Sequence, residues 1–501
     1  MQHVLSYLIW IPIFSGMIVC FLGEDRNPMI ARLIALGTVV VTGLMCIPLL
    51  LNLDTSTYAM QYTEDFPWMP SLGIHYSLGV DGLSLLLIAL SIFTNLVVIL
   101  ATWSSIKKRV AQYFAAFLIM QGFLVGVFAA TDAILFYIFW EATLIPMYLI
   151  IGIWGSDNRM YAAIKFFLYT FLGSVLMLAA FLYLGYIANS FAIETFYALK
   201  LSMTAQTLIF IGFFLGFAIK IPMFPVHTWL PDAHTEAPAG GSVVLAAILL
   251  KLGAYGFIRF GLPIIPDACR HFAPLMIALS LIAVVYIGLV AVIQKDMKRL
   301  IAYSSISHMG FVTLGCFAIY RIADASQMQF AGIILEGAII VMISHAFVSS
   351  GMFAGVGYLY DRMHTRNIDD FGGIVNSMPV FASFLMLFAM ANAGLPGTSG
   401  FVGEFMVILG SMKAGFWLAF WAATTLIIGA AYTLWMYKRV IFGVVTNPKV
   451  ETLSDLSFYE TSAYVLLALM VIGMGVYPKP FLTYIHQTVS HTLELAAQSK
   501  G

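Results

Sequence analysis

About fourteen apolar runs follow one another along this chain, and most are long enough to cross a bilayer as a helix, which takes about 20 residues. Only 10% of the 501 residues are charged, and the mean hydropathy is +0.95. Because lipid offers the backbone no hydrogen bonds, such runs must be helical, and the sequence predicts an all-α polytopic membrane protein. The predicted spans lie near residues 3–22, 30–51, 81–103, 112–130, 132–154, 162–190, 204–224, 241–262, 273–293, 299–320, 330–358, 378–410, 414–437 and 458–478.

Several classes of function are disfavoured by the polar residues. The formal net charge is zero, which gives no reason to expect nucleic acid as a partner. The four cysteines are scattered without a Cys-x-x-Cys pair, so neither an iron–sulfur or zinc site nor a disulfide framework is expected. The first apolar run has no preceding Lys or Arg and no small-residue cleavage site, and we interpret it as the first span and not as a signal peptide.

The basic residues indicate an orientation. Lys and Arg are about twice as frequent in one alternate set of predicted connections as in the other, and the loop from Asn52 to Val80 carries acidic residues and no basic one. Basic connections stay in the cytoplasm. Both termini are therefore predicted to be outside, which in a bacterium is the periplasm.

Two of the predicted spans contain helix breakers beside a charge. The stretch 212–260, GFFLGFAIKIPMFPVHTWLPDAHTEAPAGGSVVLAAILLKLGAYGFIRF, places four prolines between Lys220 and Lys251, and the run 391–410 combines Pro396 and four glycines with Glu404. Two interrupted spans about five helices apart are typical of an inverted repeat. The predicted division is three helices at 1–111, a first five-helix repeat at 112–262, a second at 263–442, and a last helix with a tail at 443–501.

Few ionisable residues remain inside the predicted membrane segments. Each charged one costs roughly 2.5–3.5 kcal/mol at the bilayer centre, so they should pair, become neutral or line water. A proton relay is the functional interpretation. The alternatives are a structural ion pair for Glu141, packing for Lys251 and a satisfied core position for His308 and His345. The residues are Glu141, Lys220, Lys251, His308, His345 and Glu404.

Other polar residues have simpler interpretations. His227, Asp232, His234 and Glu236 have the composition of a metal cluster, but their proline-rich context favours a capped turn at a helix break. Asp81 and Asp132 each stand at the start of a span, where a carboxylate caps a helix. No phosphate-binding loop and no nucleophile–base set is recognisable.

Four segments resemble a known family: FYIFWEATLIPMYLIIGIWG (136–155), WLPDAHTEAPAGGSVVLAAILLKLGAYG (229–256), KDMKRLIAYSSISHMGF (295–311) and GLPGTSGFVGEF (394–405). They are similar to the antiporter-like M-type subunits of bacterial NADH:quinone oxidoreductase, or respiratory complex I. The resemblance covers most of the chain and is weakest at both ends and in the 52–80 loop. One feature departs from the family, because Gln121 lies where some members have a glutamate near the fourth span.

The resemblance implies a proton path. Glu141 would pair with Lys220 in a broken seventh helix, and protons would pass by way of Lys251, His308 and His345 to Glu404 in a broken twelfth helix. The resemblance also implies that the chain is a subunit of a proton-pumping translocase of the bacterial inner membrane. No cofactor is expected in this chain, since FMN, iron–sulfur clusters and quinone would be bound by partner subunits. Its neighbours would be the antiporter-like L and N subunits and membrane lipid.

Two other functions are open on the sequence alone. The chain can be a subunit of a Mrp-type cation/proton antiporter, which shares the broken-helix motif and is driven by ion gradients. It can also be a passive scaffold that spaces other subunits, although the costly buried charges disfavour this.

Overall fold

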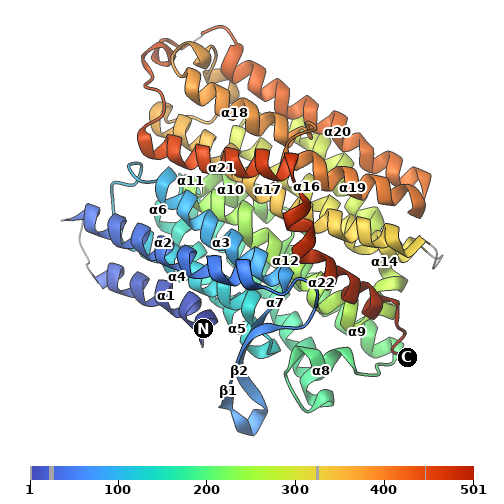
Figure 1. Ribbon diagram of the computed structural model, residues 1–501. Helices are drawn as coiled ribbons and strands as arrows, with labels where there is room; N and C mark the ends of the chain where they lie inside the picture. The colour runs from blue at the N-terminus through green and yellow to red at the C-terminus, as the bar shows by residue number, and fades with distance from the viewer. Residues whose placement is uncertain (1–2, 22–26, 323–326, 446) are drawn as a thin grey trace.

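The computed structural model describes residues 3–21, 27–322, 327–445 and 447–501, and nearly all of its regular structure is helical (Figure 1). Thirteen of the described helices are long and apolar enough to cross a membrane, which confirms the predicted all-α membrane fold. Residue 22, the end of the first predicted span, lies outside the described residues. The thirteen helices are α1 (Val4–Phe21), α2 (Pro28–Asn52), α3 (Gly82–Ala101), α4 (Val110–Ala129), α5 with α6 (Ala133–Ala142 and Leu144–Trp154), α7 (Arg159–Ala188), α9 (Met203–Lys220), α11 to α13 (Ala239–Val244, Leu250–Gly256 and Leu262–Ile264), α14 with α15 (Pro266–Ile282 and Gly288–Val292), α16 (Met297–Ala318), α17 (Met328–Met363), α20 (Phe416–Tyr437) and α21 (Phe458–Val476).

The first predicted break lies where the prolines place it. Helix α9 ends at Lys220, a turn follows, and the chain resumes as the eight-residue helix α10 (Trp229–Glu236). The break leaves backbone groups without helical partners, and the protein itself pairs some of them. The Trp229 indole N–H donates to the Ile219 carbonyl at 2.9 Å, and the Met223 N–H donates to the Ala218 carbonyl at 2.8 Å. The interruption is thus covered by protein, as the absence of water in lipid requires.

The second predicted break divides the run 378–410. Helix α18 (Pro379–Asn392) and helix α19 (Ser399–Ala414) are joined by a turn in which Gly394 and Gly397 have φ angles of +76° and +90°. Side chains with a Cβ rarely adopt this conformation, so glycine is required there. The twelfth predicted crossing is therefore made of two shorter helices, which is why only thirteen of the described helices have the length to span a membrane alone.

The helix that carries Lys251 is irregular on both sides of that residue. One-turn π-helices at Leu245–Leu249 and Phe257–Gly261 flank α12. Every residue from Ala239 to Ile264 is buried except Ala239 itself. Such π-turns are frequent at functional sites because they widen the helix and re-aim its side chains. Helix α17 passes beside this region and packs against α11, α16, α18, α19 and α21, so it lies at the centre of the bundle (Figure 1).

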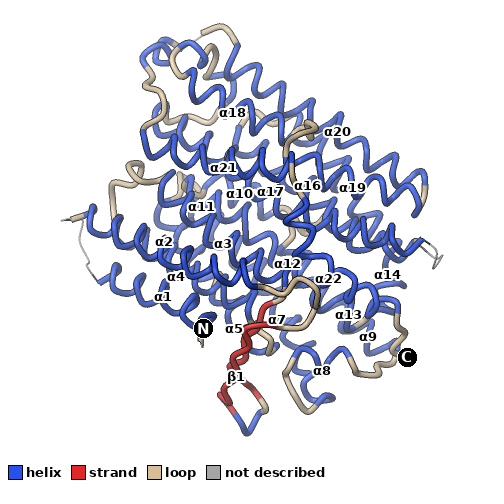
Figure 2. The backbone as a smooth tube through the Cα atoms, in the orientation of Figure 1, coloured by secondary structure: helices blue, strands red, loops and turns tan. Residues whose placement is uncertain are grey.

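Two features at the terminal end of the bundle were not predicted. The 52–80 loop contains an antiparallel hairpin of β1 (Gln61–Met69) and β2 (Ile74–Val80), and within the described residues these are the only strands longer than a bridge (Figure 2). The expected C-terminal tail is instead the helix α22 (Lys479–Ala497), which packs across α3, α13, α14 and α17. Both chain termini lie at the same end of the bundle as the hairpin (Figure 1). The short helix α8 (Ile193–Tyr197) lies in the connection before α9.

Candidate functional site

Five of the six predicted ionisable residues are buried in the bundle, and Glu141 is half-buried. They lie on α5 (Glu141), α9 (Lys220), α12 (Lys251), α16 (His308), α17 (His345) and α19 (Glu404). Helices from both predicted repeats therefore supply the six ionisable residues. The structure brings four of these residues together and leaves the other two apart.

Lys251 contacts His345 directly. The Lys251 Nζ lies 2.7 Å from His345 Nδ1 and donates to the Ala246 carbonyl at 2.6 Å, within the π-turn that precedes α12. An ammonium group is only a donor, so when Lys251 is charged His345 Nδ1 accepts and the imidazole proton is on Nε2. That Nε2 atom is buried and has no hydrogen-bond partner within the described residues. It is therefore free to exchange a proton with a further group.

His308 and Glu404 form a second contact. His308 Nδ1 lies 2.6 Å from Glu404 Oε1, and the His308 and His345 ring centroids are 5.9 Å apart. A cavity of about 20 Å³ lies among these side chains and is lined also by Ser344 and Asn392. A cavity needs roughly 10–15 Å³ to hold one water molecule. The two contacts are thus separated by a small cavity in which one water can bridge the two histidines.

Lys220 has a different environment. Its Nζ is buried without a hydrogen-bond partner in the described part of the chain, 5.3 Å from the Trp140 ring centroid and 5.8 Å from that of Phe166. An aromatic face attracts a cation by its quadrupole. Glu141 follows Trp140 in the sequence, but no ion pair joins it to Lys220 within the described residues, and its Oε1 atom is unpaired. The charges of Glu141 and Lys220 nevertheless act on each other, so the two groups are neighbours that do not form a direct ion pair in this conformation.

His234 is the residue that the sequence analysis assigned wrongly. It is fully buried on α10, its ring stacks on Phe353 at 4.3 Å, and neither ring nitrogen has a partner within the described residues. The charges of Lys298 and Lys251 both act on it. The structure places it within a helix and not in a capped turn. The signal that could have identified His234 is its position within the interrupted helix, since every residue of such a break must be enclosed by protein or water.

The other members of that polar group point away from His234. Asp232 contacts Lys165 at 2.6 Å, and the Glu236 carboxylate accepts the Asn158 N–H at 2.9 Å. These side chains serve contacts between helices and do not converge on one point. No group of three or more His, Cys, Asp or Glu side chains within the described residues is placed to hold a metal ion.

A second buried charge cluster lies at the terminal end of the bundle. Arg259 donates to the Asp81 carboxylate at 2.6 Å and contacts the Ser84 hydroxyl and the Tyr255 hydroxyl at 3.3 Å each. Thr488 of α22 also donates to Asp81, at 3.0 Å. Arg259 was not among the buried ionisable residues that the sequence identified. It is instead buried, because the cap residue of α3 supplies a carboxylate beside it.

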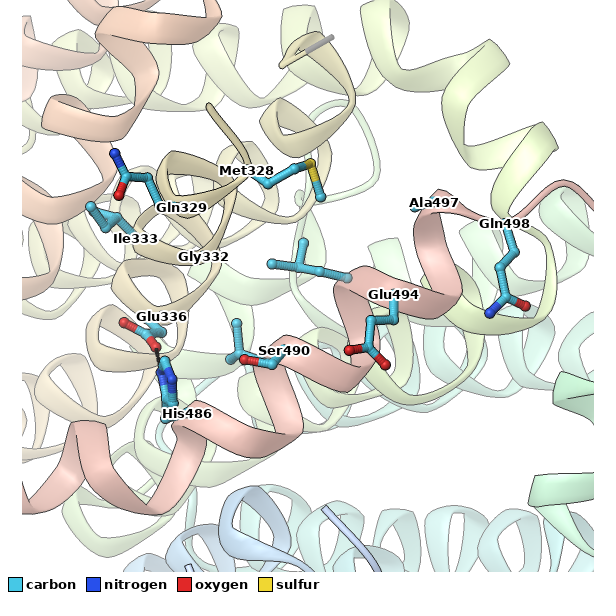
Figure 3. Close-up of a pocket in the computed structure, with 12 residues that line it drawn as sticks. Met328, Gln329, Gly332, Ile333, Glu336, His486, Ser490, Glu494, Ala497 and Gln498 are labelled. Atoms are coloured by element: carbon cyan, nitrogen blue, oxygen red, sulfur yellow. Dashed lines mark hydrogen bonds and ion pairs between the residues drawn. The ribbon is translucent and has the colours of Figure 1, made fainter. Parts of the chain in front are cut away.

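A large surface cavity is lined by other residues. It has a volume of about 770 Å³ and lies between the first turns of α17 and the helix α22 (Figure 3). Its polar groups include Glu336 and His486, which are 2.7 Å apart. None of the six predicted residues lines it. Size therefore does not identify the functional site in this molecule, and the buried contacts described above do.

Comparisons with known proteins give one consistent result. The family model described as "NADH:quinone oxidoreductase/Mrp antiporter, TM" matches residues 130–429. The chain is 45% identical over 510 residues to the NADH-quinone oxidoreductase subunit M of Rhodobacter capsulatus, covering 99% of this chain and 97% of that protein. It is 41% identical to the NADH-ubiquinone oxidoreductase chain 4 of Marchantia polymorpha, covering 98% and 97% of the two chains.

Solved structures show the same fold. A chain of respiratory complex I from Thermus thermophilus matches with a TM-score of 0.88 and 30% identity, covering 99% of this chain and 100% of that chain. A chain of the Mrp complex from Dietzia sp. matches with a TM-score of 0.81 and 20% identity, covering 98% of this chain but only 52% of that chain. The second likeness concerns the fold alone.

Proposed function

The chain belongs to the NADH:quinone oxidoreductase/Mrp antiporter family of membrane subunits, and from this premise we propose that it is the M-type subunit of a bacterial NADH:quinone oxidoreductase. In this role it translocates protons across the membrane while electron transfer takes place in other subunits. The relatives at 40–45% identity carry the name of that enzyme and are matched over nearly their whole length. A Mrp-type antiporter subunit is the second candidate, and it is less favoured because the chain covers only half of the Mrp chain.

The observation that carries the proposal is the series of contacts from Lys251 through His345 to His308 and Glu404. The contacts within it are 2.7 Å and 2.6 Å long, and the intervening cavity has room for one water. A proton that leaves the Lys251 ammonium can pass to His345, cross the cavity to His308 and reach the Glu404 carboxylate. Each transfer is between a donor and an acceptor within hydrogen-bond reach or one water apart.

The input to this series is the unpaired Lys220 site. At an effective dielectric constant of about 20, a carboxylate about 4 Å from an ammonium group stabilises its charge by about 4 kcal/mol, or roughly a factor of 10³ in a proton equilibrium. Approach of Glu141 would therefore hold the proton on Lys220, and withdrawal would release it. His234, which lies on α10 after the break, is the group we assign between Lys220 and Lys251.

The setting of the subunit follows from the same proposal. FMN, iron–sulfur clusters and quinone would be bound by partner subunits, and the membrane neighbours would be the antiporter-like L and N subunits. The membrane would be the bacterial inner membrane, with both termini in the periplasm. The two interrupted helices would belong to inverted repeats at 112–262 and 263–442.

Two substitutions test this function. Lys220→Ala and Glu141→Ala should each leave the complex assembled but lower both its NADH:quinone reductase activity and its proton transport, measured in membrane vesicles with a pH-sensitive dye. Lys413→Ala is the matched control, because Lys413 is exposed and lies against the Phe330 ring away from the relay. Normal proton transport in an assembled Lys220→Ala complex would contradict the route.

The two candidate functions are separated by the proteins that purify with the chain. Flavin and iron–sulfur proteins should remain bound to it under mild detergent extraction if it belongs to the redox enzyme. If the chain instead purifies only with other antiporter subunits, and an imposed sodium gradient drives transport, the hypothesis of a Mrp-type antiporter subunit is favoured.

A further inference from the structure

A second polar cluster lies beside the His308–Glu404 contact and has no part in the series described above. Tyr432 of α20 lies with its hydroxyl 3.5 Å from His308 Nε2 and 2.8 Å from the Ser304 hydroxyl on α16. Asn392, the last residue of α18, donates from Nδ2 to the hydroxyls of Ser304 at 3.2 Å and Thr433 at 2.8 Å. All four residues are buried. The cluster therefore links the second broken helix to the free nitrogen of His308.

The hydroxyls of this cluster can be arranged in two ways. In the first, Asn392 donates to Ser304, Ser304 donates to Tyr432, and Tyr432 donates to His308 Nε2. In the second, Tyr432 donates to Ser304 and accepts a hydrogen bond from the His308 Nε2–H group, while Ser304 donates to the Asn392 side-chain carbonyl oxygen, 3.5 Å away. A hydroxyl group has one donor and two acceptor positions, so both arrangements are allowed.

Each arrangement fits one protonation state of His308. In the first, a neutral His308 carries its proton on Nδ1 and donates it to the Glu404 carboxylate. In the second, His308 is either an imidazolium, with both nitrogens donating, or a neutral ring. In the neutral ring, Nδ1 accepts a hydrogen bond from a protonated Glu404 carboxyl group. The hydrogen bond made by one ring nitrogen sets which proton the other can exchange. Reversal of two hydroxyls thus accompanies a change in the charge of the pair.

We propose that Tyr432 is a positioning residue for proton transfer at His308, which it holds in orientation and tautomer through a reversible hydroxyl chain anchored by Asn392. The inference rests on the proposed function, since it concerns the same proton series. The charged and titratable groups that face His308 are Glu404 from α19, His345 from α17 with Lys251 behind it, and Tyr432 from α20. Tyr432 is the only one of these that reaches Nε2 within the described residues.

The test removes one hydroxyl and keeps the ring. Tyr432→Phe in the assembled complex should lower NADH-driven proton transport by about tenfold, the factor that corresponds to the loss of one hydrogen bond. Tyr437→Phe is the matched control, because Tyr437 is buried on the same element and its hydroxyl donates to the Ala382 carbonyl at 2.9 Å, away from His308. Its transport should equal that of the unmodified complex.

The pH profile separates positioning from packing. In Tyr432→Phe the pH of half-maximal transport should shift relative to the unmodified complex, whereas it should not shift in Tyr437→Phe. Unchanged transport, or a loss of transport with an unshifted profile, would overturn the inference. If Tyr432→Phe does not assemble, Ser304→Ala is measured in its place, because it leaves the Tyr432 ring intact and breaks the same chain at the next hydroxyl.

A third variant distinguishes failure of this inference from failure of the proposed function. Glu404→Gln removes the acceptor of the series itself, so it should abolish transport whether or not Tyr432 contributes. Normal transport in both Glu404→Gln and Tyr432→Phe would contradict the proposed function. Normal transport in Tyr432→Phe together with a strong loss in Glu404→Gln would contradict only the role of Tyr432.

Discussion

Lys220 and Arg259 are both buried cations in the predicted first repeat, residues 112–262, but their surroundings differ. Arg259 is held at the terminal end of the bundle by a carboxylate at 2.6 Å and by two hydroxyls at 3.3 Å. Lys220, beside the break in the first interrupted helix, has its Nζ 5.3 and 5.8 Å from two aromatic ring centroids, and the Glu141 charge acts on it without a direct ion pair. No hydrogen bond reaches the Lys220 Nζ within the described residues.

The difference shows what each charge can do. A buried cation that is fully paired gains nothing by losing its proton, and removal of its partner leaves an uncompensated charge, so it stabilises the fold. A buried cation that is poorly paired has charged and neutral forms of more similar free energy, so a small movement of a carboxylate can change its state. The Arg259 cluster is therefore assigned to structure and the Lys220 site to proton exchange.

The largest effect on stability is expected from Asp81→Asn, which removes the carboxylate charge beside Arg259. Asparagine can keep the helix-cap bond that Asp81 accepts from the Ser84 N–H at 2.9 Å, so the main loss is the negative charge beside Arg259. Breaking a buried pair in this way costs about 3–5 kcal/mol. We expect the variant complex to lose this subunit at a markedly lower temperature, as measured by native gel electrophoresis after heating. A stability equal to that of the unmodified complex would show that the Arg259 cluster is not structural.

The same pair predicts a pH dependence. Burial opposes ionisation of Asp81, but the Arg259 charge and the hydrogen bonds from Ser84 and Thr488 outweigh it, and the pKa of Asp81 is lowered. A lowered pKa in the folded state means that the stabilisation is complete above the unfolded value of about 3.9 and is lost as the pH falls through the folded value. The stability difference between the unmodified and Asp81→Asn complexes should thus be constant from pH 8 to about pH 5 and decrease only below about pH 4.

A smaller effect is expected at the Lys220 site from the loss of an aromatic face. A desolvated cation–π contact is worth about 2 kcal/mol, and Trp is the best of the aromatic faces. Trp140→Phe should therefore reduce proton transport moderately and Trp140→Leu more strongly, in both cases less than Lys220→Ala. Phe136→Leu is the control, because Phe136 packs on Trp140 from the preceding turn and Lys220 makes no contact with its ring. Equal losses in Trp140→Leu and Phe136→Leu would indicate a packing effect.

Much of the membrane fold was predictable because the bilayer restricts what an apolar run can do. The spans follow from length and hydropathy, and both interruptions follow from Pro222, Pro225 and the glycines around Pro396. The hairpin and α22 were not predicted. Both are amphipathic elements at the end of the bundle, where water relaxes these restrictions and only the tertiary packing decides the structure.

The site was predicted as a set of residues and not as a set of contacts. A charge deep in an apolar run is visible in the sequence, and this identified Lys220, Lys251 and Glu404. The partner of each charge was not visible, since Arg259 and Asp81 meet across 178 positions and Lys251 and His345 across 94. His234 was assigned to a capped turn because its context is rich in proline, whereas it lies on the short helix α10 and is fully buried.

The smallest effect on stability is expected from substitution of Asp132. Like Asp81 it caps a helix, but in the part of the chain that the structure describes it has no arginine beside it that corresponds to Arg259. Asp132 caps α5 through the Ile134 and Leu135 N–H groups at 2.8 and 3.0 Å and also accepts the His75 N–H at 3.1 Å, yet no ion pair reaches it within the described residues. Burial dominates there and raises the pKa of Asp132. Asp132→Asn keeps the cap, loses one hydrogen bond and removes a buried charge, so it should cost no more than about 1 kcal/mol.

The pH dependence of the two aspartates should therefore have opposite signs. A raised pKa means that the folded state holds the proton of Asp132 more tightly, so stability is greatest below the unfolded value and decreases as the pH rises through the folded value. On acidification the unmodified complex should gain stability relative to Asp132→Asn and lose it relative to Asp81→Asn. Heating the three complexes in parallel between pH 4 and pH 8 measures both differences. A loss in Asp132→Asn as large as that in Asp81→Asn would mean that the cap, and not the Arg259 charge, accounts for the stability of this end of the bundle.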